Sequence, residues 1–510
     1  EITAFCANNV VSYPDRSGGA RLAEVILYDK VLTDQERRDT EAYLAKKWFN
    51  RDMPGYGAPR LPILNAFGSA NWVRSDSAAL SIGQLTVTNS LVLPVNTEVK
   101  MVRSTLSGTL NLAGGRLQVE NYTVPATPPA GVTLHADATT GIVASGDKVT
   151  RWNHASGGSH YAYADTGCEP TLVAAGLNNK PIVDFGLNGS KLYMKWETNV
   201  VFRSFFWVAQ QLGNNTEPIG AWMPMMGAAS HFYRGVATVW NPGVNQTTRT
   251  GVSYLSERQV DPLFATMPTT QFALYGQVLA ASSIANGFAC GAYDAANNLR
   301  PERTGGLKLA EMLIYERKLS EREALDAQAY LNWKWFNTAS IGYAAPDGSV
   351  YIQAVTNSLA TTEGELILTG TAPVRIGSYG GNVKITTAVP VTIEGGSYTA
   401  TSLDTAYFQG FADLVLADQT TLTTDLPAVL AVTGALTVNG TGTLNVTFPN
   451  TDYPGDYPLI QFGSIDGASA ARLTQWTVSG VPARYRSSLV IQNNQLVLRV
   501  STSGTIMLIQ

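Results

Sequence analysis

One block of sequence occurs twice in this chain. The stretch "GGLKLAEMLIYERKLSEREALDAQAYLNWKWF" occupies Gly305–Phe336, and a near copy, "GGARLAEVILYDKVLTDQERRDTEAYLAKKWF", occupies Gly18–Phe49. At an offset of 287 the match continues without a gap to Pro59 and Pro346, and 20 of the 42 aligned positions are identical. Chance would give about two or three identities, so the block is an internal repeat, which is typical of modular proteins.

Each copy predicts a strand, a turn and a helix. The apolar runs "LAEVILYD" and "LAEMLIYE" have the length and composition of a buried strand. Thr33 with Glu36, and Ser320 with Glu323, then form capping boxes that start a helix. In a capping box the hydroxyl accepts from an N–H group of the first turn, and the glutamate accepts from the backbone of the capping residue.

Both predicted helices carry an aromatic face. The residues at helical spacing are Tyr43, Leu44, Lys47 and Trp48 in the first copy, and Tyr330, Leu331, Lys334 and Trp335 in the second. A face of this kind needs a partner surface to exclude water. We therefore expect each helix to pack its aromatic side on another part of the protein.

Length and composition indicate a β-rich, multidomain protein. The chain has 510 residues, which corresponds to several domains. Charged residues make up 15%, below the roughly 25% of ordinary globular proteins, and the net charge is −4. No basic stripe exists for nucleic acid, and no apolar run reaches the ~20 residues of a membrane span. This composition favours an extracellular or cell-surface location.

The stretches that follow the two blocks alternate apolar and polar residues. Period-two alternation broken by Gly and Asn every six to ten residues predicts many short strands. Two architectures fit, a β-solenoid and a β-sandwich, and the recurring "G-x-L-x-[VL]" cadence favours the solenoid. The terminal "GTIMLIQ" is read either as a closing strand or as a strand donated to a neighbouring subunit.

Several motifs resemble the laminin-G-like, concanavalin A-type jelly roll found in large bacterial surface proteins. The resemblance rests on three motifs of the repeated block: "AE" followed by apolar residues and Tyr, "L[ST]xxE", and a helix ending "YLxxKW". Upstream of the second copy, "GVTLHADATTGIVASGDKVTRWNHASGG" resembles the opening of such a module, and "PTLVAAGLNNKPIVDFG" resembles its next signature. The resemblance implies a jelly-roll sandwich with a capping helix at its carboxyl end.

The predicted fold class is mainly β, with jelly rolls flanked by repeat modules. We expect the end of a truncated jelly roll at 1–56, a short β-repeat module at 57–126, a complete jelly roll at 127–343, and a solenoid-like or sandwich module at 344–510. The chain begins with Glu and without a signal peptide, so we expect a processed product or a fragment. The front half of the first jelly roll would come from the same parent chain or from another polypeptide.

The sequence holds no recognisable catalytic signature. The "ExDxxE" strand of jelly-roll glucanases is absent, Glu257 and Asp261 lack its spacing, and no GxSxG elbow occurs. Lectin-like binding would need an aromatic platform, for which Trp222, Tyr233 and Trp240 are the candidates, with core packing as the alternative.

Metal and disulfide sites are weakly indicated. We expect no cofactor; Ca²⁺ is the ion that Asp137, Asp165 and Asp184 would suit, although their spacing matches no known calcium loop. Cys6 and Cys290 occupy similar strings, "ITAFCANN" and "ANGFACGAYD", so Cys168 would pair with Cys290 and Cys6 would have lost its partner. The alternative is three buried thiols.

These observations together favour a non-enzymatic structural or adhesive protein, such as a fibre, stalk or surface-layer component. Self-association with other copies is the expected interaction, and a polysaccharide is a second candidate partner. Carbohydrate binding without catalysis is the alternative function, and a polysaccharide hydrolase is the third.

Overall fold

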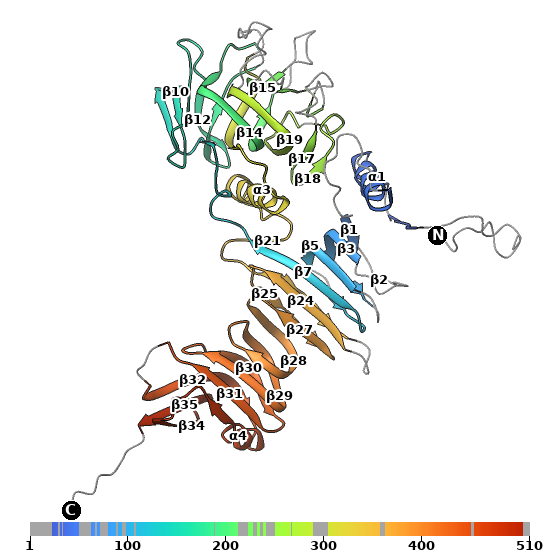
Figure 1. Cartoon of the computed structure of the whole chain (residues 1–510), viewed down its shortest axis with the longest axis vertical. Coiled ribbons are helices and arrows are strands. Elements are labelled where there is room, and N and C mark those ends of the chain that lie inside the picture. The colour runs from blue at the N-terminus through green and yellow to red at the C-terminus, as the bar shows by residue number, and fades with distance from the viewer. Residues whose placement is uncertain are drawn as a thin grey trace, which may run out of the picture.

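The computed structural model of the protein is mainly β, as the alternating pattern predicts, with 56% of the described residues in strands and 9% in helices. The described residues are 23–28, 31–32, 34–49, 63–66, 69–71, 80–87, 90–93, 98–106, 109–187, 189–212, 223–227, 232–234, 238–240, 250–266, 268–288, 304–357, 363–449 and 453–502. Figure 1 shows a long molecule in which strands are stacked along the axis and a rounder domain lies at one end. We call residues 124–342 the inserted domain, and the strands before and after it the stack.

The stack is built from parallel strands that add one above another. One sheet orders β1 (Ile63–Ala66), β3 (Leu80–Val87), β5 (Glu98–Leu106), β7 (Arg116–Thr123), β24 (Gly364–Gly370) and β27 (Val383–Thr387). A second orders β2 (Ser69–Asn71), β4 (Ser90–Val92), β6 (Thr109–Asn111), β23 (Ala354–Thr356), β26 (Tyr379–Gly380), β28 (Val391–Asp404), β29 (Phe408–Asp425), β30 (Leu430–Val438) and β32 (Gly455–Ile465). Beside them lie β22 (Val350–Ile352), β25 (Val374–Ile376), β31 (Gly442–Thr447) and β33 (Thr477–Ser479).

The two β-repeat stretches, expected as separate modules, form one continuous stack. Partners in neighbouring strands are normally about 20 residues apart, as in Ile63 with Gln84, but Arg116 of β7 pairs with Glu365 of β24, 249 residues later. The chain leaves the stack after Thr123 and returns at β21 (Tyr343–Ala344), which pairs with the end of β7. An insertion is tolerated here because its two ends lie side by side, so the ladder around it is preserved.

Apolar side chains form rows inside the stack, because equivalent apolar positions of neighbouring strands pair with one another. Strand β24 alternates buried and partly exposed residues, so one face of each strand supplies the core. Leu117 pairs with Leu366, and Leu366 with Ile385, and all three are buried. Each fully buried aliphatic side chain contributes about 1.5–3 kcal/mol, so each added turn of chain stabilises its neighbours.

The far end of the stack is closed by a change in pairing. β35 (Gln495–Thr502) pairs antiparallel with β32, and β34 (Tyr485–Gln492) pairs antiparallel with β35. Helix α4 (Gly467–Leu473) starts at the N-cap Asp466 and lies beside β30. Closing a stack in this way covers apolar rows that would otherwise face water. The segment "GTIMLIQ" lies outside the described residues.

The inserted domain contains a closed ring of strands. The ring runs β14 (Met194–Gln211), β11 (Tyr161–Tyr163), β10 (Lys148–Asn153), β12 (Thr171–Leu177), β13 (Lys180–Asp184), β20 (Leu307–Tyr315) and back to β14. Attached to it are β8 (Leu134–Asp137), β9 (Ile142–Ser145), β15 (Met223–Gly227), β16 (Phe232–Arg234), β17 (Gly251–Leu255), β18 (Arg258–Val260) and β19 (Ala273–Phe288). Its core is strongly aromatic, with Trp152, Trp207 and Phe205 among the buried residues.

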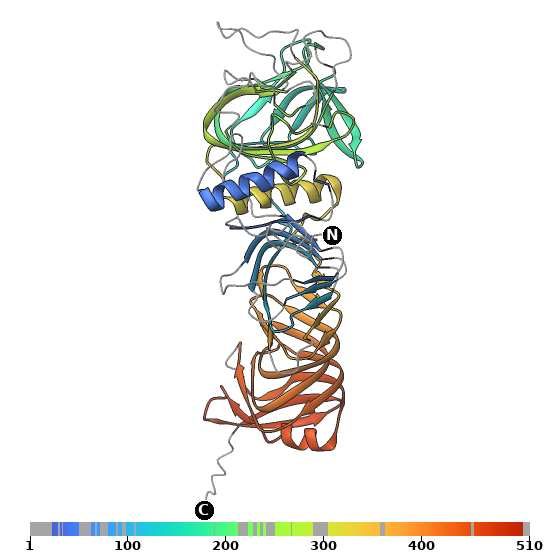
Figure 2. The ribbon, with the colours of Figure 1, turned by 90° about the vertical axis from the view of Figure 1, so that its right-hand side faces the viewer.

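Helix α3 (Glu321–Phe336) joins the inserted domain to the stack. The predicted capping box is confirmed: Ser320 accepts from the backbone of Glu323, whose side chain accepts from the Ser320 backbone. One face of the helix packs on the strands of the inserted domain through Leu331 and Trp335. The opposite face carries Leu325, which packs with Val124 at the point where the chain leaves the stack. The helix is therefore buried on two sides (Figure 2).

An arginine fixes this junction. The Arg322 guanidinium lies 3.0 Å from the ring centre of Tyr122 and 4.8 Å from that of Tyr343, the two residues at which the chain leaves and re-enters the stack. Asp326 holds Arg322 at 2.7 Å and accepts from the Tyr343 hydroxyl at 2.7 Å. At the tip of the β17–β18 hairpin, Glu257 accepts from Ser340 of the returning chain.

In the first copy of the repeat the helix is present, but the strand expected before it is not formed in the described residues 23–28. Helix α1 (Asp34–Phe49) lies against β18. Residues 24–28 alternate between more and less exposed positions, and they pair with no strand in the part of the chain that the structure describes. Tyr43 is buried whereas Trp48 is 45% exposed, so the sandwich expected under both aromatic residues is missing under the tryptophan. No described helix has the length and apolarity of a membrane span.

Candidate functional site

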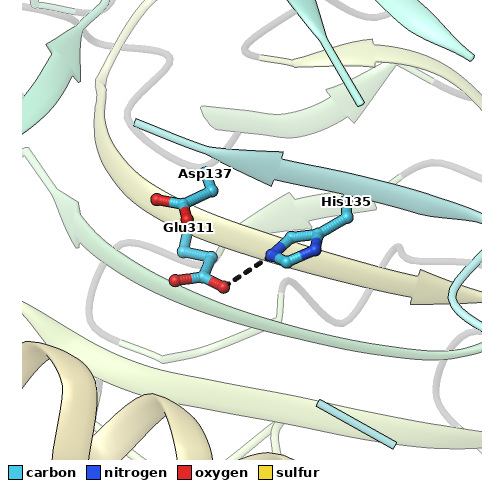
Figure 3. A group of neighbouring side chains, drawn as sticks. All are labelled: His135, Asp137 and Glu311. Atoms are coloured by element: carbon cyan, nitrogen blue, oxygen red, sulfur yellow. Dashed lines mark hydrogen bonds and ion pairs between the residues drawn. The ribbon is translucent and has the colours of Figure 1, made fainter. Parts of the chain in front are cut away.

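The most unusual group of side chains in the described residues is a buried cluster of His135, Asp137 and Glu311. Strands β8 and β20 are antiparallel neighbours, and Glu311 lies directly opposite Asp137. Because alternate residues of a strand share a face, His135 and Asp137 project to the same side as Glu311. Figure 3 shows the three side chains converging, and their ligand-type atoms lie within 4.8 Å of one another.

Glu311 accepts hydrogen bonds from several directions although its side chain is fully buried. Its Oε1 lies 2.7 Å from Nε2 of His135 and accepts from the Tyr330 hydroxyl at 3.0 Å. Its Oε2 accepts from the Trp335 indole at 2.6 Å. Burial, together with the neighbouring Glu311, raises the pKa of Tyr330 well above its ordinary value, so its hydroxyl stays protonated and donates.

Lys334 supplies the positive charge that a buried carboxylate pair requires. Its ammonium lies 2.6 Å from Oε2 of Glu311 and 2.5 Å from Oδ2 of Asp137. Asp137 is further held by Thr139, which donates both its backbone N–H and its hydroxyl. A divalent ion would have to displace the Lys334 ammonium from this position. The Lys334 ammonium thus balances the charge of the two carboxylates, and we interpret the cluster as a structural ion-pair network.

Part of this network, without the histidine and the aspartate, is repeated in the described residues of the first copy. Glu24, which precedes helix α1, accepts from the Trp48 indole at 2.7 Å and from the Tyr43 hydroxyl at 3.2 Å. Lys47 lies 3.1 Å from Oε2 of Glu24 and donates to the Tyr43 hydroxyl at 2.7 Å. We call the four residue types Glu, Tyr, Lys and Trp the quartet. Because the quartet forms in both copies, it is a feature of the repeat that links the helix to the segment before it.

A sequence signal for the quartet existed. A glutamate stands in the middle of an otherwise apolar strand in both copies, where a charge is costly unless it is paired. Helical spacing places Lys47 and Lys334 on the aromatic faces but indicates no partner for either lysine. His135, which completes the second network, was not singled out at all.

The residues proposed for sugar binding are not brought together as a platform in the described residues. Trp222 and the side chain of Tyr233 lie outside them, although the backbone of Tyr233 belongs to β16. Trp240 is fully buried, packs edge-on against Tyr275 and donates its indole N–H to Gln277. It therefore has the core-packing role that the sequence left open, and presents no face to a sugar.

Three histidines border one small pocket. His135, His154 and His160 line it together with Trp152, Tyr161 and Phe288, and the space between them does not admit a water molecule. A ligand site usually has about 300–1,000 Å³, so a sugar does not fit here. The histidines also have protein partners: Ser156 bonds to both His135 and His154, and Glu197 bonds to His160. Burial, and next the charge of His135, lower the pKa of His154.

The aspartates considered for Ca²⁺ each have a lysine partner. Lys334 pairs with Asp137, as described above. Lys195 lies 2.7 Å from Asp165, which also accepts from the Tyr193 hydroxyl. Asp184 has Lys308 at 3.6 Å and accepts from the backbone of Gly186. An ammonium group at each carboxylate competes with a calcium ion for the same oxygens.

The predicted disulfide stays a prediction. Cys168 is partly exposed and carries a free thiol, and its backbone carbonyl accepts from Tyr193. Cys6 and Cys290 lie outside the described residues.

Comparison with known proteins adds no identification, because no family model, no curated protein and no solved structure matches this chain.

Proposed function

We propose that this chain is a structural and adhesive protein of the cell surface, in which a rod carries a lectin-like domain. The rod would be a β-solenoid, and the inserted domain would be a laminin-G-like jelly roll of the concanavalin A type. Under this proposal the protein is not an enzyme, works outside the cell, and associates with copies of itself.

The observation that carries the proposal is the unbroken ladder of parallel strands. The second sheet of the stack contains nine parallel strands from β2 to β32, which makes eight steps of about 4.8 Å, roughly 38 Å along the axis. The ladder is continuous past the inserted domain, since β6 pairs directly with β23. A body that grows by identical steps is suited to reaching outward and to presenting domains at defined heights.

The junction supports the same role. Arg322 is held between Tyr122 and Tyr343, and helix α3 is buried between the inserted domain and the stack. A cation held over aromatic rings contributes about 1–2 kcal/mol when it is shielded from water. The domain is thereby presented in one orientation, as an adhesive or assembly module requires.

Small-angle X-ray scattering tests the rod. A compact protein of 510 residues has a radius of gyration of about 24 Å. We expect a clearly larger value for the full chain and an elongated distance distribution. A variant in which a short Gly-Ser linker replaces residues 125–341 should keep an elongated stack. A value near 24 Å for the full chain would refute the rod, and failure of antibodies to label intact cells would refute the surface location.

A further inference from the structure

The first copy of the repeat exposes the positions that the second copy buries. At an offset of 287, Leu27 corresponds to Ile314 and Trp48 to Trp335. Leu27 is 56% exposed and Trp48 is 45% exposed, whereas both counterparts are 0% exposed. Val25 and Phe49 are exposed as well. We call Val25, Leu27, Trp48 and Phe49, together with Glu24 and Lys47, the N-terminal surface.

The second copy shows what covers these positions. Strand β8 pairs antiparallel with β20, so that Asp137 lies opposite Glu311 and His135 opposite Leu313. On its other edge β20 pairs with β14. In the described part of the first copy neither neighbour is present, and residues 24–28 pair with no strand. A backbone segment without a strand partner can serve as a template for another strand.

The charges define the missing neighbour further. In the second copy Lys334 contacts two carboxylates, Glu311 and Asp137, and Glu311 also meets His135. In the first copy, as far as the structure describes it, Lys47 contacts Glu24, and no aspartate or histidine joins them. The quartet is present but lacks the histidine and the second carboxylate, which in the complete network come from a single strand.

We propose that the N-terminal surface is the docking site for the front half of a second jelly roll, supplied by polypeptide outside these 510 residues. Its first strand would carry His and Asp two positions apart and run antiparallel to residues 24–28. In the register of β8 and β20, its Asp would lie opposite Glu24 and its His opposite Ile26. A second copy of this chain is the poorer occupant, because its own β8 already pairs with β20. The inference rests on the proposed jelly-roll character of the inserted domain.

A fusion tests the docking within the full chain. Because Cys6 and Cys290 correspond, Glu1 corresponds to Ala285, so a second copy of residues 126–284 can be joined directly to Glu1. Hydrogen exchange measured by mass spectrometry should show the amides of residues 24–28 exchanging at least about tenfold more slowly in the fusion than in the unfused chain. The matched control carries His135→Ala and Asp137→Ala in the added copy only, and should lose most of this protection.

The outcomes separate this inference from the proposed function. Equal exchange of residues 24–28 with and without the added copy would overturn the docking site. An added copy that stays unfolded would overturn it too. The added residues 126–284 lack a counterpart of β20 and α3, so they can fold only if they dock on the N-terminal surface. Protection of residues 24–28 in an unfused dimer would assign the surface to a second copy instead. The rod is tested separately, by the X-ray scattering of the unfused chain and of the variant without residues 125–341, and none of these exchange results bears on that test.

Discussion

Replacing Glu311 by glutamine should destabilise the inserted domain far more than the same change at Glu24. The carboxylate of Glu311 is met by Tyr330, Trp335 and Lys334, and an amide offers one acceptor oxygen in place of two. At least one buried donor then faces an NH₂ group.

The magnitude follows from these contacts. Hydrogen bonds to a charged group contribute about 1.5–3 kcal/mol each, and breaking a buried ion pair costs about 3–5 kcal/mol. Lys334 keeps Asp137 as a partner, so we expect about 3 kcal/mol for Glu311→Gln. At 1.36 kcal/mol per tenfold, this raises the open population roughly a hundredfold.

Glu24→Gln is the matched control, because it changes the same quartet where it is partly hydrated. Lys47 is 39% exposed there and Trp48 is 45% exposed, so the expected cost is below about 1 kcal/mol. Hydrogen exchange of the amides of β8 and β20 reports the local opening directly, and the amides of β28 and β29 serve as an internal reference. Similar losses from the two variants, or less than about a fivefold change at β20, would refute the argument from burial.

Three further predictions concern pH and the junction. Because burial lowers the pKa of His154 in the folded state, the unfolded chain binds the proton more tightly, and the inserted domain should lose stability as the pH falls below about 6.5; His154→Gln should flatten that slope in urea titrations. Hydrogen bonds from Arg317, and then from the Ser320 backbone, lower the pKa of Glu323 to about 2. The capping box therefore contributes fully above pH 4.5 and fades towards pH 2; we expect at most about 1 kcal/mol, measured as the difference between wild type and Glu323→Gln at pH 6 and pH 2.5. Arg322→Lys should broaden the distance distribution between fluorophores on the inserted domain and the stack, because an ammonium cannot stack between two rings; an unchanged distribution would show that α3 alone fixes the angle.

Local structure could be predicted well from the sequence, because strands and helices are indicated by hydrophobic periodicity and by helix-capping residues. The alternation of residues 364–370 marks a half-buried strand, and the structure has that pattern of burial. Ser320 and Glu323 marked the start of a helix, and the capping box is present. These features depend on residues within a few positions of one another.

Long-range pairing was beyond what periodicity can give. Alternation fixes which face of β7 is apolar, but does not say that its next neighbour is β24 rather than a strand nearby in sequence. The buried network was missed for the same reason. Glu311 meets Lys334 from the following helix and His135 from 176 residues earlier, and no spacing rule connects them. Trp240 shows the same limit, because its Gly-rich surroundings left core packing and ligand binding both open, and the structure places it in the core.

The return of the chain at Tyr343, directly beside Tyr122, separates two mechanical tasks. A pull along the axis passes from β7 straight to β24 through their backbone hydrogen bonds, without entering residues 124–342. The inserted domain is thus shielded from tension, which the paired strands of the stack bear instead. It can therefore have low stability, or be replaced by a different domain, without weakening the stack.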